Sequence, residues 1–310
     1  MANRTDFFFP SSDGKTQIHA VKWESDAPRA IFQITHGMTE FIDRYAPFAE
    51  YLAEHGFTVV GHDHLGHGDS AHKPEDYGYF ADKKGAECLV EDIHRLRELT
   101  QKEYPALPYF ILGHSMGSYM LRRYLTVHGA GLAGALIMGT GANPASVCMA
   151  GQAVSAGIAL FHGWHYRSDF MYNLFFSGSF QKFNCDGSEP KRSWLSRDTG
   201  IVETYHKDPR CHFRFTLRAY YDFLGTIRYD GKMKNIRKMP KDVPVFLLSG
   251  DDDPVGEFGA TVQKVHDWFR EAGVKDLTIK IYPGYRHELL RELDKDAVFA
   301  DILAWCNERT

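Results

Sequence analysis

Short apolar segments rich in β-branched and aromatic residues alternate along the chain with longer segments whose apolar residues recur at helical spacing. The short segments predict six strands, which end at His36, Asp63, His114, Thr140, Gly250 and Pro283. Such alternation is typical of a mostly parallel sheet flanked by helices. The sequence therefore predicts an α/β protein with a mostly parallel central sheet.

Further elements are expected near both ends of the chain. The segments DFFFPSS and TQIHAVKWE, on either side of Gly14, predict an antiparallel hairpin at one sheet edge. Leu89, Ile93, Leu96 and Leu99 recur on one face and predict a helix of roughly five turns. A closing helix is predicted from the apolar residues Ala297, Phe299, Ile302, Leu303 and Trp305.

The regular alternation stops after Thr140 and resumes near Asp242. Positions 141–235 hold 17 Phe, Tyr and Trp residues, with 12 basic and 8 acidic residues, so this segment carries +4 and the remainder −8. An aromatic-rich segment without strand patterns predicts a helical insertion, which could serve as a lid with an apolar wall. We expect an α/β core at residues 1–140 and 241–310, and a helical cap (lid) at residues 141–240, here called the cap segment.

Composition and charge narrow the class of protein. A chain of 310 residues with 44% hydrophobic content is long enough for one large core with an insertion. The net charge of −4 offers no basic surface for a phosphate backbone, so nucleic acid is not an expected partner. Five widely spaced cysteines without a C-x-x-C pattern argue against a disulfide framework or a structural zinc site, and favour a reducing cytoplasm.

Two apolar stretches are considered as a signal peptide or a membrane-spanning segment. The N-terminal segment lacks the apolar core of a signal peptide, and the apolar stretch at 149–161 is too short to span a bilayer. We therefore expect a soluble cytoplasmic protein whose cap segment could still make transient contact with a membrane or lipid surface.

The sequence GHSMG at positions 113–117 is the first sign of chemistry. It directly follows a predicted strand and directly precedes a predicted helix, which is the setting of a nucleophilic serine on a sharp turn. Gly113 and Gly117 let the helix pass close to the strand. The pattern predicts Ser115 as a nucleophile, at the positive end of the helix that follows.

A serine nucleophile needs a base, and the base needs an orienting acid. The strand ending at Gly250 is followed by Asp251, Asp252 and Asp253, and the next strand is followed by His287. The order serine, aspartate, histidine, each beyond the carboxyl end of a strand, predicts a catalytic triad. We favour Asp253 because Pro254 fixes the turn after it, with Asp251 as the alternative.

Acyl transfer also needs donors for the developing oxyanion. Gly37, in HGMTE after an early strand, allows the chain to turn back over the sheet. This places the backbone N–H of Met38 where it could join that of Met116, the residue after the proposed nucleophile.

A rival site lies in GHDHLGHGDS, where His62, His64 and His67 approach the H-x-H-x-D-H spacing of binuclear metallohydrolases. Gly66 stands where an aspartate ligand is needed, and the glycines equally fit an ordinary turn. A metal site at these histidines and a non-catalytic binding protein on the same fold remain as alternatives.

Nearly the whole chain resembles the α/β-hydrolase branch that contains monoacylglycerol lipases, lysophospholipases and serine aminopeptidase-like hydrolases. The similar segments include HGMTEFIDRYAPFAEYLAEHGF, GHDHLGHGDS, GHSMGSYMLRRYL, SGDDDPVG and YPGYRHELLRE. The resemblance implies the α/β-hydrolase fold, the triad Ser115, Asp253 and His287, and the oxyanion donors Met38 and Met116. Within the cap segment, WLSRD and YHKDPRCHFRFT also look like the lids of bacterial lysophospholipase-type members, without a chemical role for any residue.

The resulting prediction is a serine hydrolase that needs no cofactor and cleaves small-molecule acyl esters. Monoacylglycerol-like or lysophospholipid-type esters come first. A small-ester carboxylesterase, and an amidase or aminopeptidase using the same triad, are the alternatives.

Overall fold

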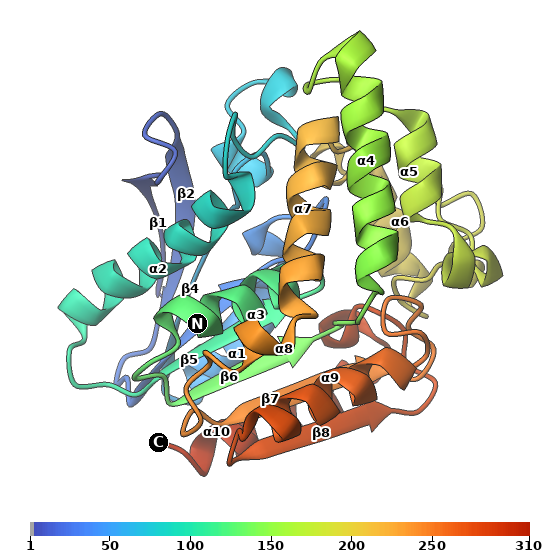
Figure 1. Ribbon diagram of the computed structural model, residues 1–310. Coiled ribbons are helices and arrows are strands. Elements are labelled where there is room, and N and C mark those ends of the chain that lie inside the picture. Colours follow the sequence, from blue (N-terminus) through green and yellow to red (C-terminus); the bar gives the residue numbers. More distant parts are fainter. Residues whose placement is uncertain (1–2) are drawn as a thin grey trace.

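The computed structural model describes residues 3–310 and contains one eight-stranded sheet (Figure 1). Its strands run in the order β1-β2-β4-β3-β5-β6-β7-β8. Their bounds are Asn3–Pro10 (β1), Gln17–Glu24 (β2), Ala30–Thr35 (β3), Phe57–His62 (β4), Tyr109–His114 (β5), Gly134–Met138 (β6), Val245–Gly250 (β7) and Leu277–Tyr282 (β8). The pairs β1–β2 and β2–β4 are antiparallel, and all other pairs are parallel.

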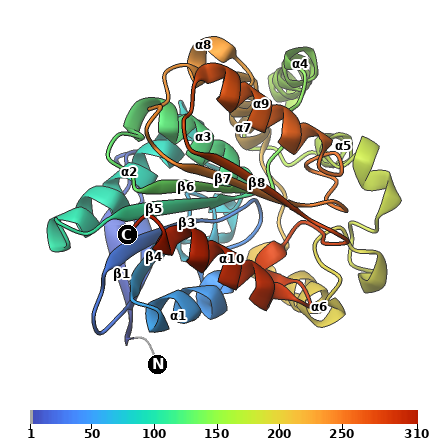
Figure 2. The same cartoon turned by 90° about the horizontal axis from the view of Figure 1, so that it is seen from below.

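Helices cover both faces of the sheet (Figure 2). One face packs against α1 (Ala46–Glu54) and α10 (Lys295–Asn307). The other packs against α2 (Gly85–Glu103), α3 (Met116–His128) and α9 (Ala260–Ala272). Strands β3 to β7 are buried along their whole length, because a parallel sheet is covered on both faces. The predicted α/β class is therefore confirmed.

The predicted elements differ from the structure mainly at their ends. All six strands and the edge hairpin are present, although β6 ends at Met138, before the predicted Thr140. In α2, Leu89, Ile93 and Leu96 are fully buried, whereas Leu99 is 42% exposed. At about 100° per residue, Leu99 lies roughly 80° around the helix from Leu89, at the margin of the apolar stripe.

The cap segment contains the helices α4 (Ala145–His162), α5 (Asp169–Phe175), α6 (Thr199–Lys207), α7 (Leu217–Asp230) and α8 (Met233–Ile236). Helices α4, α5 and α6 lie on the side of the sheet where the parallel strands end, whereas the short α8 lies beside the helices on the sheet face (Figure 1). Helix α7 packs against both α4 and α3, and so connects the cap segment to the core. Within the described residues, the cap segment holds an isolated bridge between Asn184 and Ser193 but no strand.

Helix α4 is longer than the stretch at 149–161 suggested. Its 18 residues have a mean hydropathy of 1.3, so by length and composition alone it could cross a membrane. Only 22% of it is buried, and Leu160 and Phe161 are 84% and 86% exposed. The cap segment therefore presents an apolar helix to its surroundings.

Candidate active site

Ser115 occupies the sharp turn between β5 and α3. Its backbone angles, φ 53° and ψ −122°, lie in a region that residues with a Cβ rarely adopt. The Ser115 N–H donates to the Met138 carbonyl oxygen of β6 at 2.9 Å, which ties the turn to the neighbouring strand. The expected strand–turn–helix geometry is thus present, with backbone strain at the serine itself.

The glycines around Ser115 are required by close packing. A Cβ added to Gly113 would lie 2.4 Å from the Gly117 carbonyl oxygen, and one added to Gly117 would lie 2.2 Å from the Thr35 carbonyl oxygen. Both distances are far below van der Waals contact, so any larger residue would push α3 away from β5 and β3. The G-x-S-x-G spacing therefore follows from how α3 packs on the sheet.

Asp253 and His287 come from the loops after β7 and β8. The Oδ2 atom of Asp253 lies 2.9 Å from Nδ1 of His287, and both side chains are buried. The other oxygen of Asp253 accepts a hydrogen bond from the Val255 N–H at 2.9 Å. Asp251 is exposed and accepts from the Gly284 N–H at 2.6 Å. Of the two aspartates considered, Asp253 is the one that faces the imidazole.

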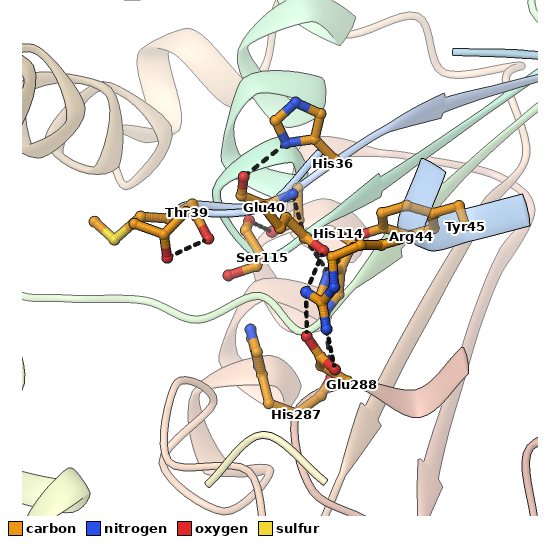
Figure 3. A network of polar contacts seen from close by, with 12 residues as sticks. His36, Thr39, Glu40, Arg44, Tyr45, His114, Ser115, His287 and Glu288 are labelled. Atoms are coloured by element: carbon orange, nitrogen blue, oxygen red, sulfur yellow. Dashed lines mark hydrogen bonds and ion pairs between the residues drawn. The ribbon is translucent and has the colours of Figure 1, made fainter. Parts of the chain in front are cut away.

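The second ring nitrogen of His287 points towards Ser115 (Figure 3). Within residues 3–310, this buried Nε2 atom has no hydrogen-bond partner. Both residues line the same cavity. Catalytic hydrogen bonds are often long until a substrate is present, so a free imidazole nitrogen that faces a hydroxyl is suited to take its proton.

Burial and charge act on His287 in opposite directions. Burial alone lowers the pKa of an imidazole, because it disfavours the charged form. The charge of Asp253 and its hydrogen bond outweigh burial, with smaller contributions from Glu288 and Glu40, so the pKa of His287 lies above its ordinary value. This environment favours proton transfer from a hydroxyl to the ring.

The loop after β3 lies against the serine. A Cβ added to Gly37 would lie 2.9 Å from the Cβ of Ser115, and the Gly37 N–H donates to Oε1 of Glu40 at 2.6 Å. The N–H groups of Met38 and Met116 donate to no other group within the described chain. Met116 begins α3, where N–H groups lack acceptors within the helix. The assignment of Met38 and Met116 as oxyanion donors stays a prediction.

A buried network of charged side chains joins this loop to the loop that carries His287 (Figure 3). Arg44 donates to Glu40 Oε2 at 3.0 Å and to Glu288 Oε2 at 3.0 Å, and all three side chains are at most 7% exposed. Burial alone raises the pKa of Glu40, but His114 and Arg44 hold that pKa well below its usual range. The residue after His287 is thereby tied to the loop beside Ser115.

A cavity of about 650 Å³ lies between the sheet edge and the cap segment. Met38, Ser115 and His287 line it from the core. Apolar side chains line it from the cap segment, among them Val147, Val154, Phe170, Leu174, Phe176, Phe180, Trp194, Phe223 and Leu224. A space of this size and lining suits an apolar ligand held beside a few polar groups.

His62, His64 and His67 are packed in the core without a metal-site geometry. The ring centroids of His62 and His64 lie 4.8 Å apart, and those of His64 and His67 lie 6.3 Å apart. Burial lowers the pKa of both His62 and His67 to about 3. Among the described residues, the group of three side chains whose ligand atoms lie within 4.8 Å of one another is a different one, namely His19, Asp63 and Asp69. The binuclear metal alternative therefore lacks support from the geometry.

Sequence reasoning missed Glu40, Arg44 and Glu288, and gave no role to Trp194. Arg44 and Glu288 are 244 positions apart, and no local pattern indicates that they meet. The available signal was their place beside motifs, in HGMTEFIDRY and RHELLRE. Trp194 also lies in a quoted segment, WLSRD, but that segment is an irregular part of the cap segment and gave no indication of the contact with His287.

A mostly parallel eight-stranded sheet, with a strained serine after β5 and a bonded Asp–His pair after β7 and β8, defines the α/β-hydrolase class. The family described as "Serine aminopeptidase, S33" matches residues 26–294, and the chain belongs to this family.

The similar proteins extend over almost the whole chain. A monoacylglycerol lipase from Mycolicibacterium smegmatis is 25% identical over 309 residues, which cover 98% of this chain and 97% of that protein. The human monoglyceride lipase is 28% identical, covering 91% of this chain and 84% of that protein. The crystal structure of a thermostable carboxyl esterase from Bacillus coagulans, in complex with glycerol, has a TM-score of 0.89 and 31% identity, covering 100% of this chain and 99% of that one. These findings confirm the resemblance drawn from the motifs.

Proposed function

We propose that this protein is a serine hydrolase that cleaves carboxylic esters, with Ser115, His287 and Asp253 as its triad. One observation carries the proposal. Asp253 Oδ2 lies 2.9 Å from Nδ1 of His287, while the opposite ring nitrogen has no partner within residues 3–310 and points towards Ser115 at the cavity. This is the relation of nucleophile, base and orienting acid that acyl transfer needs.

In the first half of the reaction, Ser115 Oγ attacks the ester carbonyl carbon while His287 Nε2 takes the hydroxyl proton. The resulting oxyanion accepts hydrogen bonds from the N–H groups of Met38 and Met116. The bond between the carbonyl carbon and the alcohol oxygen then breaks, and His287 returns its proton to the departing alcohol. Asp253 keeps the imidazole in the required tautomer and stabilises its charged form.

In the second half, His287 takes a proton from a water molecule, whose oxygen attacks the acyl group on Ser115. A second tetrahedral intermediate forms and collapses, which releases the carboxylic acid and returns the proton to Ser115. Every proton is carried by His287, so the reaction needs no cofactor.

The substrate class we propose is an ester with a medium or long acyl chain, with monoacylglycerol-like or lysophospholipid-type esters first. The apolar wall of the cavity supports this choice, because an aliphatic chain gains about 0.8 kcal/mol for each methylene group that it buries. The lipase and esterase names of the similar proteins agree with it.

A chain-length series tests this substrate class. We expect kcat/KM for p-nitrophenyl esters to rise from acetyl towards medium and long chains, and monoglycerides to be hydrolysed. An optimum at acetyl would contradict the lipid preference and favour a small-ester carboxylesterase. Faster turnover of matched anilides or aminoacyl amides would favour an amidase or aminopeptidase on the same triad. Loss of activity on adding a chelator would favour a metal mechanism instead.

We further propose that the exposed apolar face of α4 and α5 makes transient contact with lipid surfaces. Leu160 and Phe161 are more than four-fifths exposed, and α4 carries no Asp, Glu, Lys or Arg. Val147 and Phe170 are exposed and also line the cavity, so this face is continuous with the proposed substrate site. The excess of basic residues in the cap segment suits anionic lipids.

All five cysteines are free, which agrees with the proposed cytoplasmic location.

A further inference from the structure

Residues 191–197 of the cap segment, here called the clamp, are bonded directly to the loop that carries His287. The His287 N–H donates to the Trp194 carbonyl oxygen at 3.3 Å, and the next N–H along the loop, that of Glu288, donates to the Leu195 carbonyl oxygen at 2.7 Å. Two successive N–H groups thus meet two successive carbonyl groups. The backbone of the proposed catalytic base is held by the cap segment.

Charged side chains strengthen this attachment on both sides of His287. The Arg286 guanidinium donates to the carbonyl oxygens of Lys191 at 3.1 Å and Ser193 at 2.6 Å. On the other side, Arg197 Nε donates to Oε2 of the buried Glu292 at 2.8 Å. Hydrogen bonds to charged groups are stronger than neutral ones. The clamp and the histidine loop therefore form one unit, unlike a lid that must separate from the site.

The side chain at the centre of the clamp contacts the imidazole. The ring centroids of Trp194 and His287 lie 4.8 Å apart, with the planes tilted by 39°. The same indole lies 5.1 Å from the ring of Phe180 and 5.9 Å from that of Phe176, and all three aromatic residues line the cavity. Trp194 therefore contacts both the proposed base and the apolar wall of the substrate site.

We propose that Trp194 is a positioning residue for His287. The clamp holds its indole in place, and the indole contacts the acyl chain as part of the aromatic wall that it forms with Phe176 and Phe180. The inference rests on the proposed function and deepens it. The indole limits rotation of the imidazole and shields it from water while Nε2 carries the proton. An acyl chain that fills the wall packs against the same indole, so chain length and base orientation are coupled through one residue.

Substitutions of Trp194 test this role against a matched control. We expect Trp194→Ala to lower kcat for a long-chain ester about tenfold and to raise its KM, because the chain loses its contact with the indole, with smaller effects on the acetyl ester. Trp194→Phe should restore most of the loss. Trp164→Ala is the control, because Trp164 is also a half-buried cap tryptophan but packs against Tyr221 and does not line the cavity. Titration with a fluorophosphonate measures the concentration of folded active sites. Because kcat is then calculated per folded site, a variant that folds poorly is not mistaken for one that turns over slowly.

The pKa of His287, measured by NMR of its imidazole, gives a readout that does not depend on turnover. Asp253, Glu288 and Glu40 raise this pKa, and the substitution leaves all three in place. The ring of His114, whose centroid lies 4.8 Å from that of His287, is also unchanged. Burial lowers it, so removing the indole in Trp194→Ala should raise the pKa further. An unchanged pKa, or equal kcat per site for all chain lengths, would overturn the proposal. Wild-type protein that hydrolyses no ester would instead contradict the proposed function, and the NMR comparison would still decide the role of Trp194.

Discussion

The sheet edge and the clamp both position residues of the candidate site, but they do so in different ways. At the edge, Ser115, Asp253 and His287 each follow a strand within a few positions, so the order of the sheet brings them together. The clamp contains only the end of a short 3-10 helix (Pro190–Arg192) and a single bridge residue, Ser193. It places Trp194 by bonds to a loop about ninety residues further along the chain. Under the proposed function, the core carries the chemistry and the cap segment adjusts it. Changes in the core should affect every substrate, whereas changes in the cap segment should discriminate among substrates.

The largest effect is expected at the nucleophile. Ser115→Ala removes the atom that forms the acyl-enzyme, so kcat/KM should fall by about three orders of magnitude or more for every ester tested. Ser155→Ala, which removes a buried hydroxyl of α4, should stay near wild type. Near wild-type turnover by Ser115→Ala would end the proposed mechanism.

The next effect separates the two candidate aspartates. Asp253→Asn keeps the size of the side chain but cannot stabilise the charged imidazole, so kcat should fall about a hundredfold or more at neutral pH. Asp251→Asn is the matched control and should change kcat less than about twofold, since Asp251 bonds a backbone N–H on the surface. The opposite ranking would show that Asp251 orients His287.

Acidic pH should destabilise the core through its buried histidines. His62 and His67 have pKa values of about 3 in the folded chain and near 6.5 when unfolded. Between these values the unfolded state binds more protons, so the free energy of unfolding should fall as pH decreases from 6.5, by about 1.4 kcal/mol per pH unit for each histidine.

Urea unfolding at pH 7, 6 and 5 measures this slope. His62→Gln should reduce the pH dependence of the free energy of unfolding by about 1.4 kcal/mol per pH unit, the contribution of one histidine. The cap variant Leu160→Ser should leave this pH dependence unchanged. Equal slopes for His62→Gln and wild type would contradict the assignment of His62 as a neutral buried histidine.

The smallest effect on the chemistry is expected at the exposed face of α4. Leu160→Ser with Phe161→Ser should change kcat/KM for a water-soluble ester by less than about twofold, because both side chains are exposed and neither lines the cavity. Binding to anionic lipid vesicles, measured by sedimentation, should fall several-fold. Unchanged vesicle binding would remove the proposed lipid contact and leave the triad untouched.

The difference between the sheet edge and the clamp also explains which features could be predicted from the sequence. Strands β3 to β8 and the positions of Ser115, Asp253 and His287 follow from short local patterns, because strand, turn and helix signals lie within a few residues of each other. The pairing of Arg44 with Glu288, and the contact of Trp194 with His287, depend on loops that meet only in the folded chain. Leu99 was misjudged because apolar character alone does not tell whether a residue is covered, and the apolar stretch at 149–161 did not show where α4 begins and ends.

Reaction with a fluorophosphonate, followed by mass spectrometry of the labelled peptide, tests the triad most directly. The account predicts one label per chain, on Ser115, with a much slower reaction in His287→Ala and no effect of chelators. A label on another residue, or an unmodified Ser115 in a protein that still hydrolyses esters, would contradict it.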